Sequence, residues 1–249
     1  VSGIETAEMI KLIDNSSRDV FFAYANEIAR TCDSLGLNAN EIINSGKLYY
    51  DRTFIASPGL VGGPCLEKDP YIFSESLRHS RTKAEITLMA RKINERQPFE
   101  VVAYIKKKTN EIKNFPKNPN ISILGLAFKG RPITDDLRGS MSLKVYRALK
   151  KKFNNAKFYG YDPVVLKSEI NKVGLKSVSS LNDAFKNKHL VVIANNHHIF
   201  SKMDIKKLSE KLSGPSMIYD FWNHFDSKKI KLPNNVTYIG LGGNLNSNK

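Results

Sequence analysis

Apolar and polar positions divide the chain into two halves with different periods. Residues 5–35 contain neither proline nor glycine, and Gly36, which follows them, is a typical residue for the end of a helix. Ile28, Cys32 and Leu35 recur at spacings of four and three. This spacing predicts a helix with Cys32 on its buried face, as a structural rather than a reactive cysteine.

Two further helices are expected before the period changes. Residues 39–45 form a short helical pattern that Gly46 is expected to end. Residues 80–113 are mostly helical in pattern, and Pro98 within them predicts a kink or a restart instead of one straight rod. The apolar side of this stretch is marked by Ile86, Met89, Ile93, Val101, Val102 and Ile105.

The second half has the short apolar runs of β-strands. Strands are expected at residues 121–128, 157–161, 189–194, 216–219 and 236–239. Helical stretches lie between most of them, at residues 140–153, 181–186 and 203–212. This alternation predicts a parallel sheet wrapped on both faces, with ligands at the carboxyl ends of its strands. We therefore expect an α/β fold, with a helical unit over residues 1–113 and a doubly wound sheet over residues 114–249.

Composition excludes several classes of protein. The 249 residues are 41% hydrophobic and 25% charged, which is ordinary for a globular protein. No apolar run approaches the roughly 20 residues that a membrane span needs, and the first residues lack the pattern of a signal peptide. Two cysteines cannot form a disulfide framework. A cytoplasmic protein without a membrane partner is expected.

The net charge of +15 raises the question of nucleic-acid binding. The lysines are scattered through residues 106–117, 144–157 and 206–211, and aromatic residues that could stack on bases are not interleaved with them. We therefore expect no nucleic-acid partner. A basic surface would instead attract small phosphorylated molecules.

Residues 57–70, SPGLVGGPCLEKDP, carry the sharpest chemical signal. Three glycines and three prolines exclude a regular element, and Cys65 follows the Gly-Gly-Pro turn. If a helical turn begins at Cys65, backbone N–H groups and Lys68 would both favour the nucleophilic thiolate. Asp69 is close enough along the chain to orient a water or accept a proton. A cysteine buried in a tight loop is an equal alternative.

Two weaker features lie outside this segment. Lys11 and Asn15 are spaced to share one face of the first helix, where they could stabilise an oxyanion. His197 and His198 follow an expected strand and could line a ligand pocket, but adjacent residues there diverge. We expect no metal site.

Several segments together resemble the UDP-glucose/GDP-mannose dehydrogenase superfamily. In the order found in the family, they are residues 7–12 with Asn15, residues 58–70, residues 125–129 with 134–138, and residues 161–163. The resemblance implies a helical central domain that mediates homodimerisation, here through residues 5–35 and the long helix. It also implies a Rossmann-like C-terminal domain that binds a UDP-sugar.

The activity implied by the resemblance is a two-step, NAD-dependent oxidation of a sugar C6 alcohol to a uronate. Cys65 would attack the intermediate aldehyde, giving a thiohemiacetal and then a thioester that water hydrolyses. Lys11 and Asn15 would stabilise the oxyanion, and Asp69 would position or activate the water. The family pattern places Phe128, Lys129, Gly62, Gly63 and Arg52 at the substrate, and Arg138 and Lys68 at NAD.

The chain departs from the family pattern at several positions. Residues 130–132 and two extra residues before Arg138 alter one motif, and Gly139 replaces a glutamate. Ala56 stands where glucose-specific members have lysine, and residues 220–223 stand where many members have a substrate-binding arginine. These two differences favour a UDP-N-acetylhexosamine over UDP-glucose.

The family's N-terminal NAD domain, marked by G-x-G-x-x-G, has no counterpart in the sequence. Residues 240–243 resemble it only superficially, since no helix is expected after them. We therefore expect the central and C-terminal domains of a longer enzyme, inactive by themselves. Two alternatives stay open: a cysteine hydrolase or acyltransferase that pairs Cys65 with a histidine, and a non-catalytic nucleotide-binding dimer module.

Overall fold

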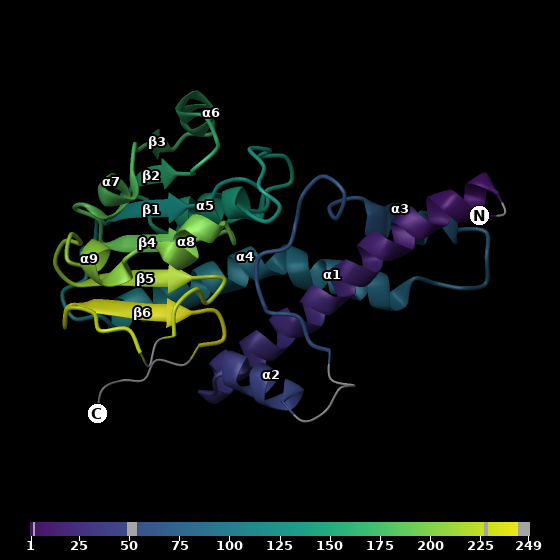
Figure 1. Cartoon of the computed structure of the whole chain (residues 1–249), viewed down its shortest axis with the longest axis horizontal. Coiled ribbons are helices and arrows are strands. Elements are labelled where there is room, and N and C mark those ends of the chain that lie inside the picture. Colours follow the sequence, from purple (N-terminus) through teal and green to yellow (C-terminus); the bar gives the residue numbers. More distant parts are fainter. Residues whose placement is uncertain (2, 49–53, 227–228, 244–249) are drawn as a thin grey trace.

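The computed structural model describes residues 1, 3–48, 54–226 and 229–243. A helical arm, formed by α1 (Ile4–Leu35), α2 (Ala39–Lys47), α3 (Asp69–Ser76) and α4 (Glu85–Glu111), extends from one side of a parallel β-sheet (Figure 1). The predicted change from helices to an alternating α/β pattern is confirmed. Within the described residues, no helix has the length and apolarity that a membrane crossing requires.

The first helix agrees with its sequence pattern. Gly36 follows α1 in the left-handed conformation, with φ 71°, and its N–H donates to the carbonyl of Cys32. Left-handed backbone is accessible to glycine without the steric cost that a Cβ would bring. Cys32 is buried, as the helical spacing predicted.

The structure corrects three details of the helical half. Gly46 does not end the second helix, since α2 continues to Lys47. Pro98 does not restart the long helix, since α4 continues through it as one helix, whereas a kink at Pro98 stays a prediction. Ile86 and Met89 are solvent-exposed in this chain, so the apolar side of α4 is narrower than the sequence pattern indicated.

The sheet has six parallel strands in the order β3-β2-β1-β4-β5-β6. This is the strand order of a doubly wound fold. Strands β2 and β3 are added on one side of β1, and β4, β5 and β6 are then added on its other side. The strands are β1 (Asn120–Leu124), β2 (Lys157–Tyr161), β3 (Lys176–Ser177), β4 (Leu190–Ile193), β5 (Ser216–Asp220) and β6 (Val236–Gly240). Their carboxyl ends point toward the helical arm (Figure 1).

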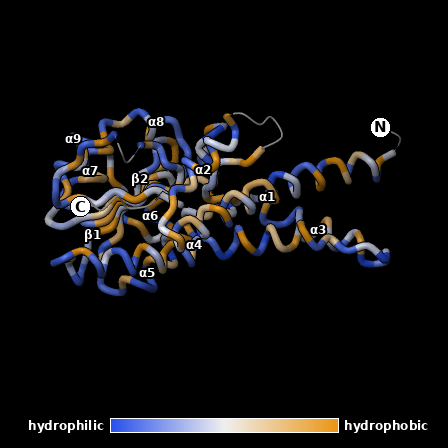
Figure 2. The backbone as a smooth tube through the Cα atoms, turned by 90° about the horizontal axis from the view of Figure 1, so that it is seen from below, coloured by the Kyte–Doolittle hydropathy of each residue, from blue (hydrophilic) through white to orange (hydrophobic). Residues whose placement is uncertain are grey.

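Both faces of the sheet are covered. Helices α4 and α5 (Met141–Lys152) pack on one face, and α7 (Leu181–Phe185), α8 (His198–Lys202) and α9 (Ile205–Ser209) pack on the other (Figure 2). Successive residues of a strand serve opposite faces: Val192 joins the α5 side and Val191 the α7 side. The short helix α6 (Lys167–Lys172) and strand β3 were not predicted from the sequence.

One hydrophobic core joins the arm to the sheet. Ala29 and Cys32 of α1 and Val102 and Ile105 of α4 belong to the same buried cluster as Ile123 of β1. The domain boundary between residues 113 and 114 stays a prediction. Residues from both sides of this boundary contribute to the same core.

Candidate active site

The cysteine-containing segment, residues 57–68, is an irregular loop between the arm and the sheet. Cys65 is exposed. The N–H groups of Lys68 and Asp69 both donate to the carbonyl of Cys65, so a turn does begin at this residue. The helix itself begins only at Asp69, so Cys65 precedes α3 by one turn.

Close backbone packing joins this loop to the sheet region. The N–H of Gly63 donates to the carbonyl of Gly139 over 2.9 Å. A Cβ on Gly62 would lie 2.6 Å from that same oxygen, and a Cβ on Gly63 would lie 2.4 Å from the ring of Phe128. Glycine is therefore required at both positions for the loop to reach the sheet. Glu67 and Lys144 add an ion pair of 2.7 Å.

Asn15 and Asp69 meet on the arm side of the loop. Asn15 Nδ2 donates to Asp69 Oδ2 over 2.6 Å, and Lys68 Nζ lies 2.5 Å from Asp69 Oδ1. The Asp69 side chain is fully buried, whereas half of Lys68 is exposed. The hydrogen bond to Asp69 raises the pKa of Lys68, with a small further contribution from Cys65. Asp69 thus fixes both neighbours beside the thiol.

Cys65 opens into a cleft of about 200 Å³ between arm and sheet. The cleft contains three cationic side chains, three aromatic rings and no carboxylate among its described lining residues. Cations suit phosphate groups, and aromatic rings offer stacking surfaces for a base. These residues are Arg18, Lys129 and Arg131, and Phe22, Phe128 and Trp222.

The sheet contributes to the cleft through the ends of three neighbouring strands. Phe128 and Lys129 follow β1, Asn196 follows β4 and Trp222 follows β5. The Lys129 ammonium lies 5.0 Å from the centre of the Phe128 ring. Trp222 is held by a bond from its Nε1 to the carbonyl of Ala194. The cleft therefore lies at the switch point of the sheet, where doubly wound folds bind ligands.

The structure brings six of the predicted residues to the cleft lining: Asn15, Gly62, Gly63, Cys65, Phe128 and Lys129. Asp69 and Lys68 are linked to them through Asn15 and the loop. Lys11 is exposed one turn before Asn15 and lies outside this lining. Arg52 lies outside the described residues.

Arg138 lies outside the cleft lining and is paired with a neighbour in the sequence. Its guanidinium bonds both carboxylate oxygens of Asp136, and 78% of its side chain is exposed. This pairing raises the pKa of Arg138 and lowers the pKa of Asp136. The role of Arg138 at NAD therefore stays a prediction.

Five cleft residues were not predicted: Arg18, Phe22, Arg131, Asn196 and Trp222. Arg18 and Phe22 follow Asn15 at helical spacings of three and seven, so the face of α1 could have indicated them. Asn196 and Trp222 each follow a strand, which marks them as residues of the ligand edge. Arg131 had no such signal.

The histidines do not complete a cysteine-hydrolase site. None of the five lines the cleft around Cys65 in the described structure. His197 is buried and stacks on His198, and its Nδ1 accepts from the N–H of Ile199. Burial lowers the pKa of His197. The described residues also contain no cluster of ligands suited to a metal ion.

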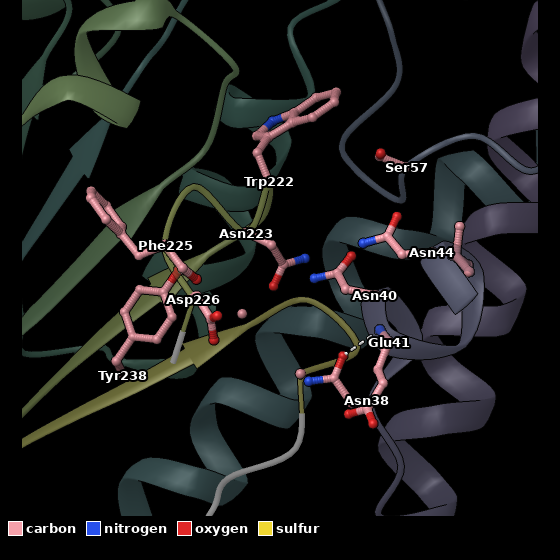
Figure 3. Close-up of a pocket in the computed structure, with 13 residues that line it drawn as sticks. Asn38, Asn40, Glu41, Asn44, Ser57, Trp222, Asn223, Phe225, Asp226 and Tyr238 are labelled. Atoms are coloured by element: carbon pink, nitrogen blue, oxygen red, sulfur yellow. Dashed lines mark hydrogen bonds between the residues drawn. The ribbon is translucent and has the colours of Figure 1, made fainter. Parts of the chain in front are cut away.

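A second hollow, of about 460 Å³, is also lined by Trp222 and lies between α2 and the ends of β5 and β6 (Figure 3). Carboxamides dominate it, and those of Asn40 and Asn223 point toward one another (Figure 3). Glu41 and Asp226 line it, and no cation does among the described residues. Its charge therefore does not suit a diphosphate, in contrast to the cleft at Cys65.

Family comparisons match both halves of the chain. Residues 5–96 match the central domain of the UDP-glucose/GDP-mannose dehydrogenase family, and residues 122–227 match its UDP binding domain. A UDP-N-acetyl-D-mannosamine dehydrogenase from Methanococcus vannielii is 32% identical over 88% of this chain and 48% of its own length. An NDP-N-acetyl-D-galactosaminuronic acid dehydrogenase from Ralstonia solanacearum is 30% identical over 85% and 48%.

Solved structures agree with these matches. A UDP-D-ManNAc dehydrogenase from Pyrococcus horikoshii superposes with a TM-score of 0.77 at 31% identity, over 96% of this chain and 52% of that one. The chain thus spans about half the length of the relatives it matches. Fold, motif order and both domain matches lead to one assignment: the chain belongs to the UDP-glucose/GDP-mannose dehydrogenase family.

Proposed function

We propose that this chain supplies the nucleophile and the nucleotide site of an NAD-dependent nucleotide-sugar 6-dehydrogenase. The observation that carries the proposal is the docking of the cysteine loop on Gly139 and Phe128, because it puts Cys65 in one cleft with the strand-end residues. The cations Arg18, Lys129 and Arg131 would bind the diphosphate, and Phe128 and Trp222 would contact the base.

Each residue near the thiol has a role in this proposal. Cys65 forms a C–S bond to the C6 aldehyde, and Asn15 donates a hydrogen bond to the resulting oxyanion. Lys11 assists from the same helix face. Removal of the second hydride would leave a thioester. Asp69, whose own carboxylate is buried, acts through Asn15 and Lys68, which it holds in place to orient a water, and hydrolysis of the thioester releases the uronate and the thiol.

The described residues fit only part of an NAD site. Gly125 and Gly130 flank the turn after β1, but added Cβ atoms there would meet Asn195 and His197, so that turn is already packed. Lys68 and Arg138 are exposed cations, each paired with an aspartate, and neither lines the described cleft. We propose that NAD, which supplies the oxidant for both hydride removals, is held by a domain outside these residues.

The sugar is proposed to be a UDP-N-acetylhexosamine. Relatives named for N-acetylmannosamine and N-acetylgalactosaminuronic acid support this choice. So do Ala56, which stands where glucose-specific members have lysine, and residues 220–223, which stand where many members have a substrate-binding arginine. We also propose a homodimer through α1 and α4, which is supported by exposed apolar side chains such as Tyr24, Ile86 and Met89. A cytoplasmic location is proposed on the same family grounds.

Calorimetry with UDP tests the nucleotide site directly. UDP should bind the 249-residue chain without NAD, because Lys129 and its neighbouring cations belong to this chain. NAD alone should bind weakly or not at all. Absence of UDP binding by the folded chain would remove the nucleotide-sugar proposal. Tight NAD binding by the isolated chain would instead show that the cofactor site lies within it.

A further inference from the structure

Four polar side chains, all of them fully buried, form one hydrogen-bonded cluster that contacts the cysteine loop. Asp19 and Asn26 come from α1, and Arg91 and Asn94 come from α4. Beside this cluster, the apolar packing between the two helices is small, and its buried members are Ala23, Ala90 and Ile93. Buried polar groups are costly unless each is paired, so this cluster needs a reason beyond helix packing.

Arg91 holds both sides of the Gly-Gly-Pro-Cys turn. Its Nη1 donates to the carbonyl of Leu66 over 2.9 Å, and its Nη2 donates to the carbonyl of Val61 over 3.2 Å. Leu66 is the residue directly after Cys65, and Val61 comes directly before the two glycines. One planar guanidinium therefore fixes the two ends of the turn that carries the thiol.

Asp19, which Asn94 holds in place, orients Arg91. Asn26 adds a third point at which the loop is attached. Asp19 Oδ1 accepts from Arg91 Nη1 over 3.0 Å and from Asn94 Nδ2 over 2.8 Å. Burial raises the pKa of the Asp19 carboxyl, and Arg91 and Asn94 oppose that rise. Asn26 binds the loop at Gly59, accepting from its N–H over 2.8 Å and donating to its carbonyl over 3.0 Å.

We propose that Arg91 is a positioning residue, which sets the place of the Cys65 thiol by fixing the carbonyls of Val61 and Leu66. Its charge is paired with Asp19 inside the protein, so its effect on the thiol comes through loop geometry. The functional consequence rests on the proposed role of Cys65 as nucleophile. A loop without other regular structure needs such attachments to hold a reacting atom in place.

Arg91→Lys tests this proposal, with Arg30→Lys as its matched control. Lysine keeps the charge, but its donors leave from one nitrogen and cannot span both carbonyls. Arg30 also joins α1 to α4, through Glu100, and makes no contact with the loop among the bonds described. Bromotrifluoroacetone should label the exposed Cys65 and leave buried Cys32 unlabelled, which gives one ¹⁹F resonance in the unsubstituted chain.

Arg91→Lys should broaden or split that resonance and speed amide exchange at Gly63 by about 10-fold or more, under conditions where Arg30→Lys changes neither. Simple loss of global stability would not produce several native-state resonances. Where the proposed oxidation is assayed, kcat should fall by about 10- to 100-fold with KM for the UDP-sugar within about twofold.

A single unchanged resonance with unchanged exchange in Arg91→Lys would overturn the proposal. If the loop loosens as expected while no variant oxidises a UDP-sugar, the positioning role stands and the proposed function fails. Should Arg91→Lys not fold, the guanidinium of Arg91 in the unsubstituted chain supplies the test. Bonds to two carbonyls should stop its rotation, so its two Nη atoms should give separate ¹⁵N resonances. A single averaged Nη resonance would equally overturn the proposal.

Discussion

The two walls of the cleft are built on different physical principles. The sheet wall stands on an apolar core, in which Ile121, Ile123 and Val192 are fully buried. The arm wall rests on the buried polar side chains Asp19 and Arg91. Apolar burial tolerates small shifts, whereas hydrogen bonds require defined distances and angles. In the proposed function, the nucleophile therefore lies on the wall that is held by directional bonds, and Phe128, Lys129 and Trp222 contact the nucleotide from the wall that rests on the apolar core.

Cys65→Ser is the largest expected change, and it separates the chemistry of the arm wall from the binding of the sheet wall. A serine hydroxyl stays protonated near neutral pH and is a poor nucleophile, so uronate production by the full-length enzyme should fall by several powers of ten. UDP binding, measured by calorimetry, should be retained because the sheet wall is unchanged.

Alkylation of the thiols provides the internal control for that experiment. Cys65 is exposed and Cys32 is buried, so iodoacetamide should modify Cys65 first, and a UDP-sugar should protect it. Faster modification of Cys32, seen by mass spectrometry, or near-normal uronate production by Cys65→Ser would contradict the assignment.

Asp19→Ala is expected to have the next largest effect, this time on stability. It removes the buried carboxylate beside Arg91 and leaves the longer contact to the partly exposed Glu95, 3.5 Å, and the loss of a buried partner typically costs about 3–5 kcal/mol. Urea unfolding at pH 7 measures this loss. Asp14→Ala, at an exposed position of the same helix, should change the free energy of unfolding by less than about 0.5 kcal/mol. Equal effects of the two substitutions would show that the arm does not depend on its polar cluster.

Lys129→Ala probes the sheet wall. Loss of one charge-assisted bond to a phosphate should weaken UDP binding by about 1–3 kcal/mol, with little change in stability. Lys107→Ala removes an equal charge from an exposed position of α4 outside the cleft lining and serves as the control. Calorimetry that finds the two variants equivalent would mean that only net charge attracts the nucleotide.

Asp33 gives the smallest expected effect, at the junction of the two walls. Burial raises the pKa of its carboxyl to about 7, although the N–H of Gly242, Lys108 and Arg30 oppose the rise. The folded state therefore binds this proton more tightly than the unfolded state. The stability that the protonated Asp33 carboxyl contributes to the fold is therefore present at low pH and is lost as the pH rises from about 4 to about 7.

Asp33→Asn should remove that pH dependence. The variant should be more stable than the unsubstituted chain at pH 8, by about 1–2 kcal/mol, and the difference should shrink toward pH 5. Thermal unfolding at the two pH values measures it. A difference that grows as the pH falls would contradict the assigned direction.

Much of the sheet was readable from the sequence because its strands are contiguous apolar runs. β2 was predicted to the residue, while β3 consists of only two residues, Lys176 and Ser177, and carries no periodic signal. The glycines and prolines around Cys65 marked the loop for a similar reason: a local residue type requires a local conformation.

The supports of that loop were not readable, because they are long-range. Arg91 and Asp19 are 72 residues apart and have the side chains of surface residues, so only their packing shows that they are buried. Asn15 and Asp69 were each singled out, but nothing in their spacing predicts that they bond over 2.6 Å. Positions on a helix face or at the end of a strand can be predicted to line the cleft, whereas contacts between residues far apart in the sequence depend on the whole fold.

The passage of α4 through Pro98 without interruption has a mechanical consequence. One half of this helix holds the cysteine loop through Arg91, and the other half lies in the core of the sheet through Val102 and Ile105. One continuous helix thus contacts both walls, and a hinge motion between the walls would have to displace close-packed side chains. The spacing of the two walls is thus linked to the position of one helix, and a change in that spacing would require α4 to move or to bend.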